Sequence, residues 1–150
     1  MSVVASLLHR LRRPKGEERE VARTDVEWAA QLTPEQFHVL RRHGTDAPFG
    51  GPSVEPDAEG MYRCAGCEAT LFRADTKFES GTGWPSFTDA ESENVELQRD
   101  LRMGIPRTEV RCRRCGGHLG HVFGDGPAPT GKRYCINASA LAPADRVNPS

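Results

Sequence analysis

The sequence contains no long hydrophobic run. Charged residues, glycine or proline interrupt every apolar stretch well before it reaches the roughly 18 residues that a transmembrane helix needs. We therefore expect no membrane segment. The N-terminal region also lacks the apolar core of a secretory signal, and its short apolar stretch is soon followed by glutamates, which argues against organelle targeting. A cytoplasmic, reducing location is expected.

An excess of charge of either sign is also missing. The 150 residues include 20 Lys and Arg against 21 Asp and Glu, for a formal net charge of -1. Binding to a polyanion or an acidic membrane depends on a positive surface field, which this balance does not provide. The composition thus argues against a general nucleic-acid-binding protein.

Uninterrupted helical stretches are scarce, because 15 glycines and 11 prolines break the chain, most of them after Gly44. This content of turn-forming residues is typical of short strands. Short segments, several with alternating apolar and polar residues, predict an antiparallel, mainly β domain. The predicted strands are 61–63, 70–72, 77–78, 94–97, 108–111, 121–123 and 133–137.

One helix is predicted before the strands. Thr33 can cap it, Pro34 suits its first position, and Gln36 completes a capping box. Gly44 has the spacing of a C-terminal cap, and a proline-rich surface loop is expected from there to Gly60. We expect one monomeric domain at 25–145, a flexible tail at 1–24 and a C-terminal tail at 146–150.

Four of the five cysteines form two pairs with Cys-x-x-Cys spacing, Cys64 with Cys67 and Cys112 with Cys115. Two such turns provide four thiolates for a tetrahedral zinc ion, and a shell closed in this way predicts one structural zinc ion that links two distant hairpins. The alternatives are a redox-active pair, which is typical of a βαβ context that this sequence lacks, and simple buried cysteines. His118 close to Cys115 is a further candidate ligand, but four cysteines already complete the shell.

The fifth cysteine, Cys135, lies on a predicted strand with polar neighbours. Strand alternation places Arg133, Cys135 and Asn137 on one face. A nearby guanidinium should lower the pKa of the thiol and favour the nucleophilic thiolate. The alternative is a small buried side chain in the core, but the polar neighbours favour catalysis.

Two further clusters carry candidate functional side chains. His118 and His121 precede Asp125, and imidazole can transfer protons near neutral pH. Trp84 follows two glycines and precedes a proline, a degree of backbone control that suits the wall of a pocket. A structural histidine pair and a core tryptophan are the alternatives.

Taken together, these motifs resemble the methionine-(R)-sulfoxide reductase B family. The motifs are the two cysteine pairs, Gly-Thr-Gly-Trp-Pro-Ser-Phe at 81–87, Arg-Thr-Glu-Val at 107–110, His-Leu-Gly-His-Val-Phe at 118–123 with Asp-Gly-Pro after it, and Arg-Tyr-Cys-Ile-Asn at 133–137. The resemblance spans roughly 28–141. It implies two antiparallel sheets with short N-terminal helices, a structural zinc opposite the active site, and reduction of methionine sulfoxide in proteins.

The resemblance also implies roles for individual residues. Cys135 matches the nucleophile, and His118, His121 and Asn137 match polar groups around the substrate oxygen. Trp84 matches the residue that packs against the substrate methyl group. The remaining matches are supporting or substrate-binding positions, namely Phe123, Asp125 and Arg133.

The chain departs from the family pattern at Thr82, where many members have a cysteine that resolves the oxidised nucleophile. With four thiolates on zinc, the sulfenic acid on Cys135 has no internal partner. We therefore expect an external reductant, either thioredoxin or a small thiol such as glutathione. The alternative functions are a zinc-dependent binding module that uses the arginines near Cys112 and a thiol peroxide sensor, and neither explains every cluster.

Overall fold

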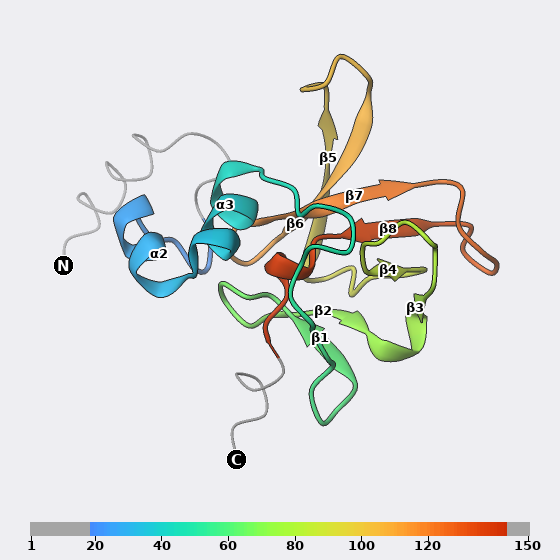
Figure 1. Ribbon diagram of the computed structural model, residues 1–150, viewed down its shortest axis with the longest axis horizontal. Coiled ribbons are helices and arrows are strands. Elements are labelled where there is room, and N and C mark those ends of the chain that lie inside the picture. The colour runs from blue at the N-terminus through green and yellow to red at the C-terminus, as the bar shows by residue number, and fades with distance from the viewer. Residues whose placement is uncertain (1–18, 144–150) are drawn as a thin grey trace.

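The structure is a computed structural model that describes residues 19–143, and it is mainly β with two antiparallel sheets, as predicted (Figure 1). The helices are α2 (Asp25–Gln31) and α3 (Pro34–Arg42), with short 3-10 helices η1 (Ala74–Thr76) and η2 (Ala138–Ala140). The strands are β1 (Met61–Arg63), β2 (Thr70–Arg73), β3 (Lys77–Phe78), β4 (Ser86–Phe87), β5 (Val95–Asp100), β6 (Arg107–Cys112), β7 (His118–Phe123) and β8 (Arg133–Ile136). Strands β1 and β2 form one sheet, and the other has the order β3-β4-β8-β7-β6-β5.

Both helices begin at a threonine cap. The Thr33 side chain accepts a hydrogen bond from the Gln36 backbone N–H, and the Gln36 side-chain oxygen accepts one from the Thr33 backbone N–H, which confirms the predicted capping box. Helix α2 begins in the same way at Thr24 with Glu27, although only the family resemblance had implied a second helix. Capping satisfies backbone N–H groups that the first helical turn leaves without partners.

The C-terminal cap of α3 differs from the prediction. His43, rather than Gly44, has the left-handed conformation, with φ of 57°. Gly44 donates its backbone N–H to the His38 carbonyl at 2.8 Å. A Cβ atom at Gly44 would lie 2.1 Å from the His38 ring. Glycine here permits the close approach of the exposed His38 side chain, and Gly44 does not have a positive φ.

The seven predicted strands are present, and β5, β6 and β7 extend further than their patterns suggested. Among residues 19–143, only the two-residue strand β4 was not predicted. It pairs with β8, with Ser86 opposite Cys135, and thereby joins β3 to the sheet. The segment 43–60 has no helix or strand, as expected.

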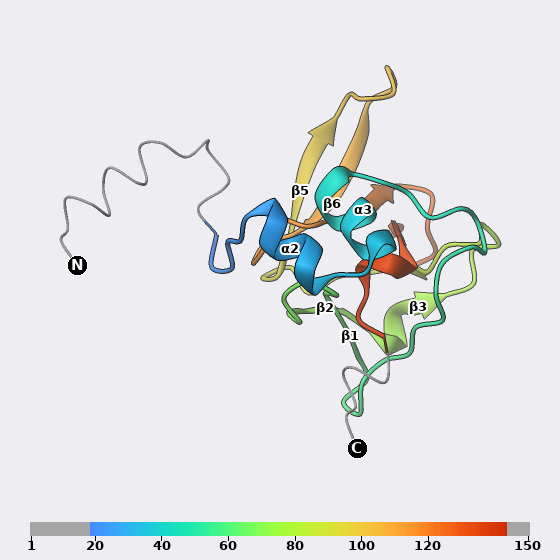
Figure 2. The same cartoon turned by 60° about the vertical axis from the view of Figure 1, so that its left-hand side comes forward.

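The core lies between the two sheets and beneath the helices. Phe72 of the small sheet stacks on Phe87 of the large one, with ring centroids 4.4 Å apart, and Tyr134 approaches Phe72 edge-on. Helix α3 packs against β7 and η2. The outer part of the β5–β6 hairpin extends away from the body of the domain in both views (Figures 1 and 2). The core thus fixes β7 and β8, which carry the candidate catalytic residues.

Residues 19–24, which fall in the expected N-terminal tail, lie against the domain. Arg19 forms an ion pair of 2.8 Å with Glu96, and the Val21 backbone donates to the Arg114 carbonyl at 3.0 Å. The rest of that tail, 1–18, and the C-terminal tail at 146–150 lie outside the described residues. Among residues 19–143, no helix has the length and apolar character needed to cross a membrane.

Candidate active site and metal centre

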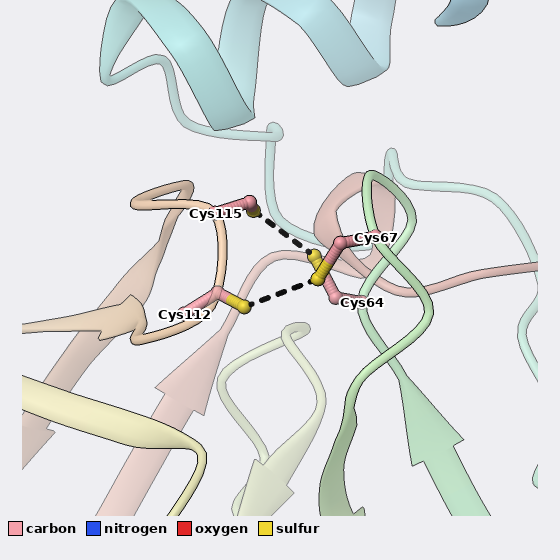
Figure 3. A group of neighbouring side chains, drawn as sticks. All are labelled: Cys64, Cys67, Cys112 and Cys115. Atoms are coloured by element: carbon pink, nitrogen blue, oxygen red, sulfur yellow. Dashed lines mark hydrogen bonds between the residues drawn. The ribbon is translucent and has the colours of Figure 1, made fainter. Parts of the chain in front are cut away.

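The four paired cysteines meet at one point, as predicted (Figure 3). Cys64 and Cys67 lie in the turn between β1 and β2, whereas Cys112 ends β6 and Cys115 follows in the turn to β7. The cluster therefore joins hairpins from the two different sheets.

The geometry of this cluster fits a metal ion. All four sulfur atoms lie within 4.8 Å of one another. The Cys64–Cys115 and Cys67–Cys112 sulfur distances are 3.8 Å and 3.5 Å. A tetrahedral zinc ion with bonds of ~2.3 Å separates its sulfur ligands by ~3.8 Å, whereas a disulfide needs about 2.05 Å. The four cysteines are thus positioned to bind a metal ion, and His118 is not part of the group.

The turns that hold these sulfurs are tight. Gly66 donates its backbone N–H to the Cys64 sulfur at 3.3 Å. A Cβ atom at Gly66 would lie 3.2 Å from the Trp28 ring, and Gly116 has φ of 79°. Glycine at both places permits a compact turn that aims the sulfurs inward.

Cys135 faces a separate cavity of about 320 Å³. Its walls come from the loop after α3, the loop before β4, and strands β6, β7 and β8. The lining residues are Thr45, Thr82, Trp84, Arg107, Gly120, His121, Phe123, Arg133, Cys135 and Asn137. This cavity brings together six of the predicted non-metal site residues.

The register of β7 and β8 explains this convergence. His121 lies opposite Cys135, and Phe123 lies opposite Arg133. Directly opposed residues on antiparallel strands have their Cβ atoms about 4.5–5.5 Å apart on the same face. Arg133, Cys135 and Asn137 all line the cavity, which agrees with the face predicted from strand alternation.

The Cys135 thiol is half-buried, and burial raises its pKa above the ordinary value. The charge of Arg133 and hydrogen bonds with the side chains of Thr82 and Arg133 lower the pKa, but they do not overcome burial. The expected net lowering was therefore wrong, although Arg133 does act in the predicted direction. Desolvation penalises the thiolate more than one neighbouring guanidinium stabilises it.

Trp84 is fixed by the loop that follows α3. Its indole N–H donates to the Asp46 carbonyl at 2.8 Å. Gly83 has φ of 91°, and a Cβ atom there would lie 2.8 Å from the Phe49 ring. The loop between Gly44 and Gly60 is thus part of the site, with Thr45 in the cavity wall, and not merely a surface connection.

Each candidate histidine has a buried carboxylate partner. His118 Nδ1 lies 2.5 Å from Glu109, and His121 Nε2 lies 2.7 Å from Asp100. Burial alone would raise the pKa of Glu109, but His118 and Arg111 lower it to about 2. The hydrogen bond with His121 holds the pKa of Asp100 well below its usual range, against the effect of burial.

Both carboxylates are therefore ionised at neutral pH, and each accepts a hydrogen bond from the ring N–H of its histidine. His118 is buried and does not line the cavity, so it lies behind His121 rather than at the wall. The two rings meet edge-on with centroids 5.5 Å apart. Sequence reasoning missed both carboxylates because they come from β5 and β6, and the histidine motif does not encode that β6 pairs with β7 and β5 with β6.

Three atoms of His43, Glu109 and His118 are also close enough to hold a cation. Arg111 at 3.0 Å and Arg102 at 3.6 Å already neutralise Glu109. A dication at this point would meet two guanidinium groups. We therefore interpret the group as a hydrogen-bonded support for the histidines.

The remaining predicted residues support the wall of the cavity. Arg133 forms two hydrogen bonds with the exposed Asp125, at 2.9 and 3.2 Å, and lies over the Phe123 ring. Asn137 donates to the Leu119 carbonyl at 3.1 Å and accepts from the Asp46 backbone at 2.9 Å. Asp125 itself does not line the cavity.

Comparison with known proteins agrees with this arrangement. The model of the SelR domain family matches residues 32–144. Peptide methionine sulfoxide reductase MsrB of Agrobacterium fabrum is 54% identical over 123 residues, which cover 81% of this chain and 91% of that protein. The chain belongs to this family.

Other MsrB proteins are similar to the same extent. That of Methanosarcina barkeri is 55% identical over 125 residues, covering 83% of this chain and 88% of the relative. That of a Synechococcus strain is 47% identical over 128 residues, covering 85% and 94%. Both the metal centre and the cavity lie within the residues that the SelR model matches.

Proposed function

We propose that this member of the MsrB family reduces methionine-(R)-sulfoxide in proteins and peptides to methionine, with Cys135 as the nucleophile. The observation that carries the proposal is the position of Cys135 opposite His121 in a cavity that Trp84 also lines. A sulfoxide needs a nucleophile at sulfur and a proton donor at oxygen, and it carries an apolar methyl group on its third side. The cavity offers a group for each.

Cys135 attacks the sulfoxide sulfur as a thiolate, while the sulfoxide oxygen takes up a proton. The oxygen atom is then transferred to the Cys135 sulfur, so that methionine is reduced by two electrons and the cysteine is oxidised to sulfenic acid. Arg133 and Thr82 stabilise the thiolate before attack, since their contacts lower the thiol pKa.

His121 is the proton donor in this scheme. Its Nε2 is held by Asp100, which leaves Nδ1 to face the substrate oxygen. Burial lowers the pKa of His121, and the Asp100 charge opposes that effect. His118, with Glu109 behind it, positions the His121 ring, and Asn137 is proposed as a polar contact for the substrate oxygen.

Trp84 is proposed to pack against the substrate methyl group. Positive character develops at the sulfur and methyl end as the thiolate attacks, and the face of an indole stabilises it. Because the indole N–H is bound to Asp46, the ring is held in one orientation. One wall for methyl and another for oxygen would select one sulfoxide epimer. Phe123 and Arg133 complete the substrate-binding wall, and Asp125 is proposed to contribute by holding the Arg133 side chain.

The metal of the four-cysteine centre is proposed to be one structural zinc ion. Four thiolates are the ligands that zinc prefers in closed sites. When bound, the ion would link the two sheets without taking part in the reaction, because no ligand position is left open.

The sulfenic acid is proposed to be reduced by an external thiol, either thioredoxin or a small thiol. The other four cysteines all belong to the metal cluster, so none is available next to Cys135. Two external thiols return Cys135 to the thiol, with release of water and formation of a disulfide. A cytoplasmic, monomeric enzyme remains our proposal, which fractionation and sedimentation will test.

A single-turnover experiment tests the chemistry. The metal-loaded protein is mixed with one equivalent of peptide-bound methionine-(R)-sulfoxide in the absence of a reductant, and sulfenic acid is trapped with dimedone. We expect one methionine and one trapped adduct on Cys135 per protein, and neither in Cys135→Ser. Methionine formation without any modification of Cys135 would contradict the proposal.

A further inference from the structure

Exposed apolar side chains gather on one loop next to the cavity. Residues 101–106 connect β5 and β6, and they contain Leu101, Met103 and Ile105, which are 58%, 71% and 67% exposed. In Figure 2 this loop is the outermost part of the hairpin. Exposed apolar side chains that cluster, rather than occur singly, mark an interaction surface.

The loop is held by the same carboxylates that support the histidines. Arg102 donates its backbone N–H to Asp100 at 2.9 Å, and its guanidinium lies 3.2 Å from Asp100 and 3.6 Å from Glu109. Gly104 closes the turn, with a backbone hydrogen bond to Leu101 at 3.0 Å and φ of 72°. These contacts tie the apolar loop to the face of the sheet that carries the cavity.

The loop is also continuous with the cavity along the chain. Arg107 lines the cavity and directly follows the loop. Ile105 is two residues from Arg107 and Met103 is four, so the backbone places them at most roughly 7 and 14 Å away. An extended peptide covers the same distances in about two to four residues.

We propose that Met103 and Ile105, with Leu101, form a docking surface for a large apolar side chain located two to four residues from the methionine sulfoxide in the substrate polypeptide. This inference rests on the proposed function and assigns it a substrate class. Methionine is among the residues most often buried, and its oxidation disrupts the surrounding core. A polypeptide damaged in this way exposes its apolar sequence neighbours together with the sulfoxide.

The substrate polypeptide is a better occupant than a second copy of this chain. The loop leads into the cavity through Arg107, so a chain whose sulfoxide occupies the cavity passes next to it. The cavity would not position a second copy at the loop, whereas a substrate polypeptide is positioned there by its own sulfoxide. Dimer formation through the loop nevertheless has a measurable signature, and it is one outcome of the test below.

The test compares three substrates that carry the same methionine-(R)-sulfoxide. They are an N-acetylated amide of the single residue, a peptide with leucine three residues away on either side, and the same peptide with glutamine at those positions. The tested variant is Met103→Gln/Ile105→Gln. The control is Val26→Gln on α2. Val26 is 80% exposed and is distant in the sequence from the residues that line the cavity.

We expect the wild type to prefer the leucine peptide by about tenfold in kcat/KM, mainly through KM. The double variant should lose this preference and reduce the single-residue amide at the wild-type rate, which shows that it is folded. The control should behave as the wild type.

Equal kcat/KM for the two peptides in the wild type, or an equal loss in the control, would overturn the inference. So would a wild-type dimer that becomes monomeric in the double variant by sedimentation. Failure of the wild type to reduce even the single-residue amide would instead refute the proposed function. The two failures are therefore distinguishable.

Discussion

Replacement of Thr82 by cysteine should give this enzyme an internal resolving thiol. The Thr82 side chain lies close enough to the Cys135 thiol to lower its pKa, and both residues line the cavity. A cysteine sulfur at position 82 would occupy nearly the place of the threonine hydroxyl. After one turnover it should attack the sulfenic acid on Cys135, form a disulfide and release water.

The stabilisation expected from this disulfide follows from the length of the chain between positions 82 and 135. A disulfide that closes a loop of about 50 residues stabilises the fold by ~4 kcal/mol in the chain-entropy treatment. For a domain of this size, that corresponds to a rise in Tm of roughly 10 °C in the oxidised variant over the reduced one. Strain in the bond would reduce this value.

The assay uses one equivalent of peptide methionine-(R)-sulfoxide without reductant, followed by intact mass measurement and dimedone trapping. The variant should lose two hydrogen atoms and bind no dimedone, whereas the wild type should bind dimedone at Cys135. Thr82→Ser is the matched control, because it keeps the hydroxyl and lacks the thiol. A folded variant that yields only sulfenic acid, with no disulfide, would refute the inferred proximity.

Three further predictions concern the supports of the site. In Arg133→Met, the loss of the guanidinium should raise the pKa of Cys135 further, so alkylation of the thiol at neutral pH should slow by about tenfold and its pH profile should move to higher pH; an unchanged profile would contradict the role of Arg133. In Asp100→Asn, the loss of the carboxylate should lower the pKa of His121. The value of kcat should therefore fall by about tenfold with little change in KM, and the alkaline limb of the pH–rate profile should move to lower pH. A change in KM alone would assign Asp100 to substrate binding instead. Removal of the metal with a chelator should unfold the domain, because the binding energy of a structural zinc, ~10–16 kcal/mol, matches or exceeds the total stability of most domains. Circular dichroism measures the loss of the fold and its recovery when zinc is added back. A fold that survives chelation would contradict a structural role.

Much of the fold could be predicted from local patterns. The capping box at Thr33 and Gln36 depends only on neighbouring residues, and it was found at the predicted place. The strand around Cys135 was recognised from its alternation, and that alternation also gave the correct face. The repeated Cys-x-x-Cys spacing was sufficient to predict that four sulfurs from two hairpins would meet.

What could not be predicted depends on pairing between distant segments. Asp100 and Glu109 reach the histidines only because β5, β6 and β7 are adjacent in one sheet. Asp46 fixes Trp84 from a loop that the sequence marks only as proline-rich. The raised pKa of Cys135 arises from burial, which a sequence does not report, whereas the opposing effect of Arg133 was visible two residues away.

The most direct test of the account is the turnover of separated R and S epimers of a peptide methionine sulfoxide, with excess dithiothreitol as the reductant. Dithiothreitol replaces the physiological reductant, so the result depends only on the cavity and on Cys135. We predict reduction of the R epimer alone by the wild type, and of neither epimer by Cys135→Ser. Reduction of both epimers at similar rates, or activity that persists without the Cys135 thiol, would contradict the account.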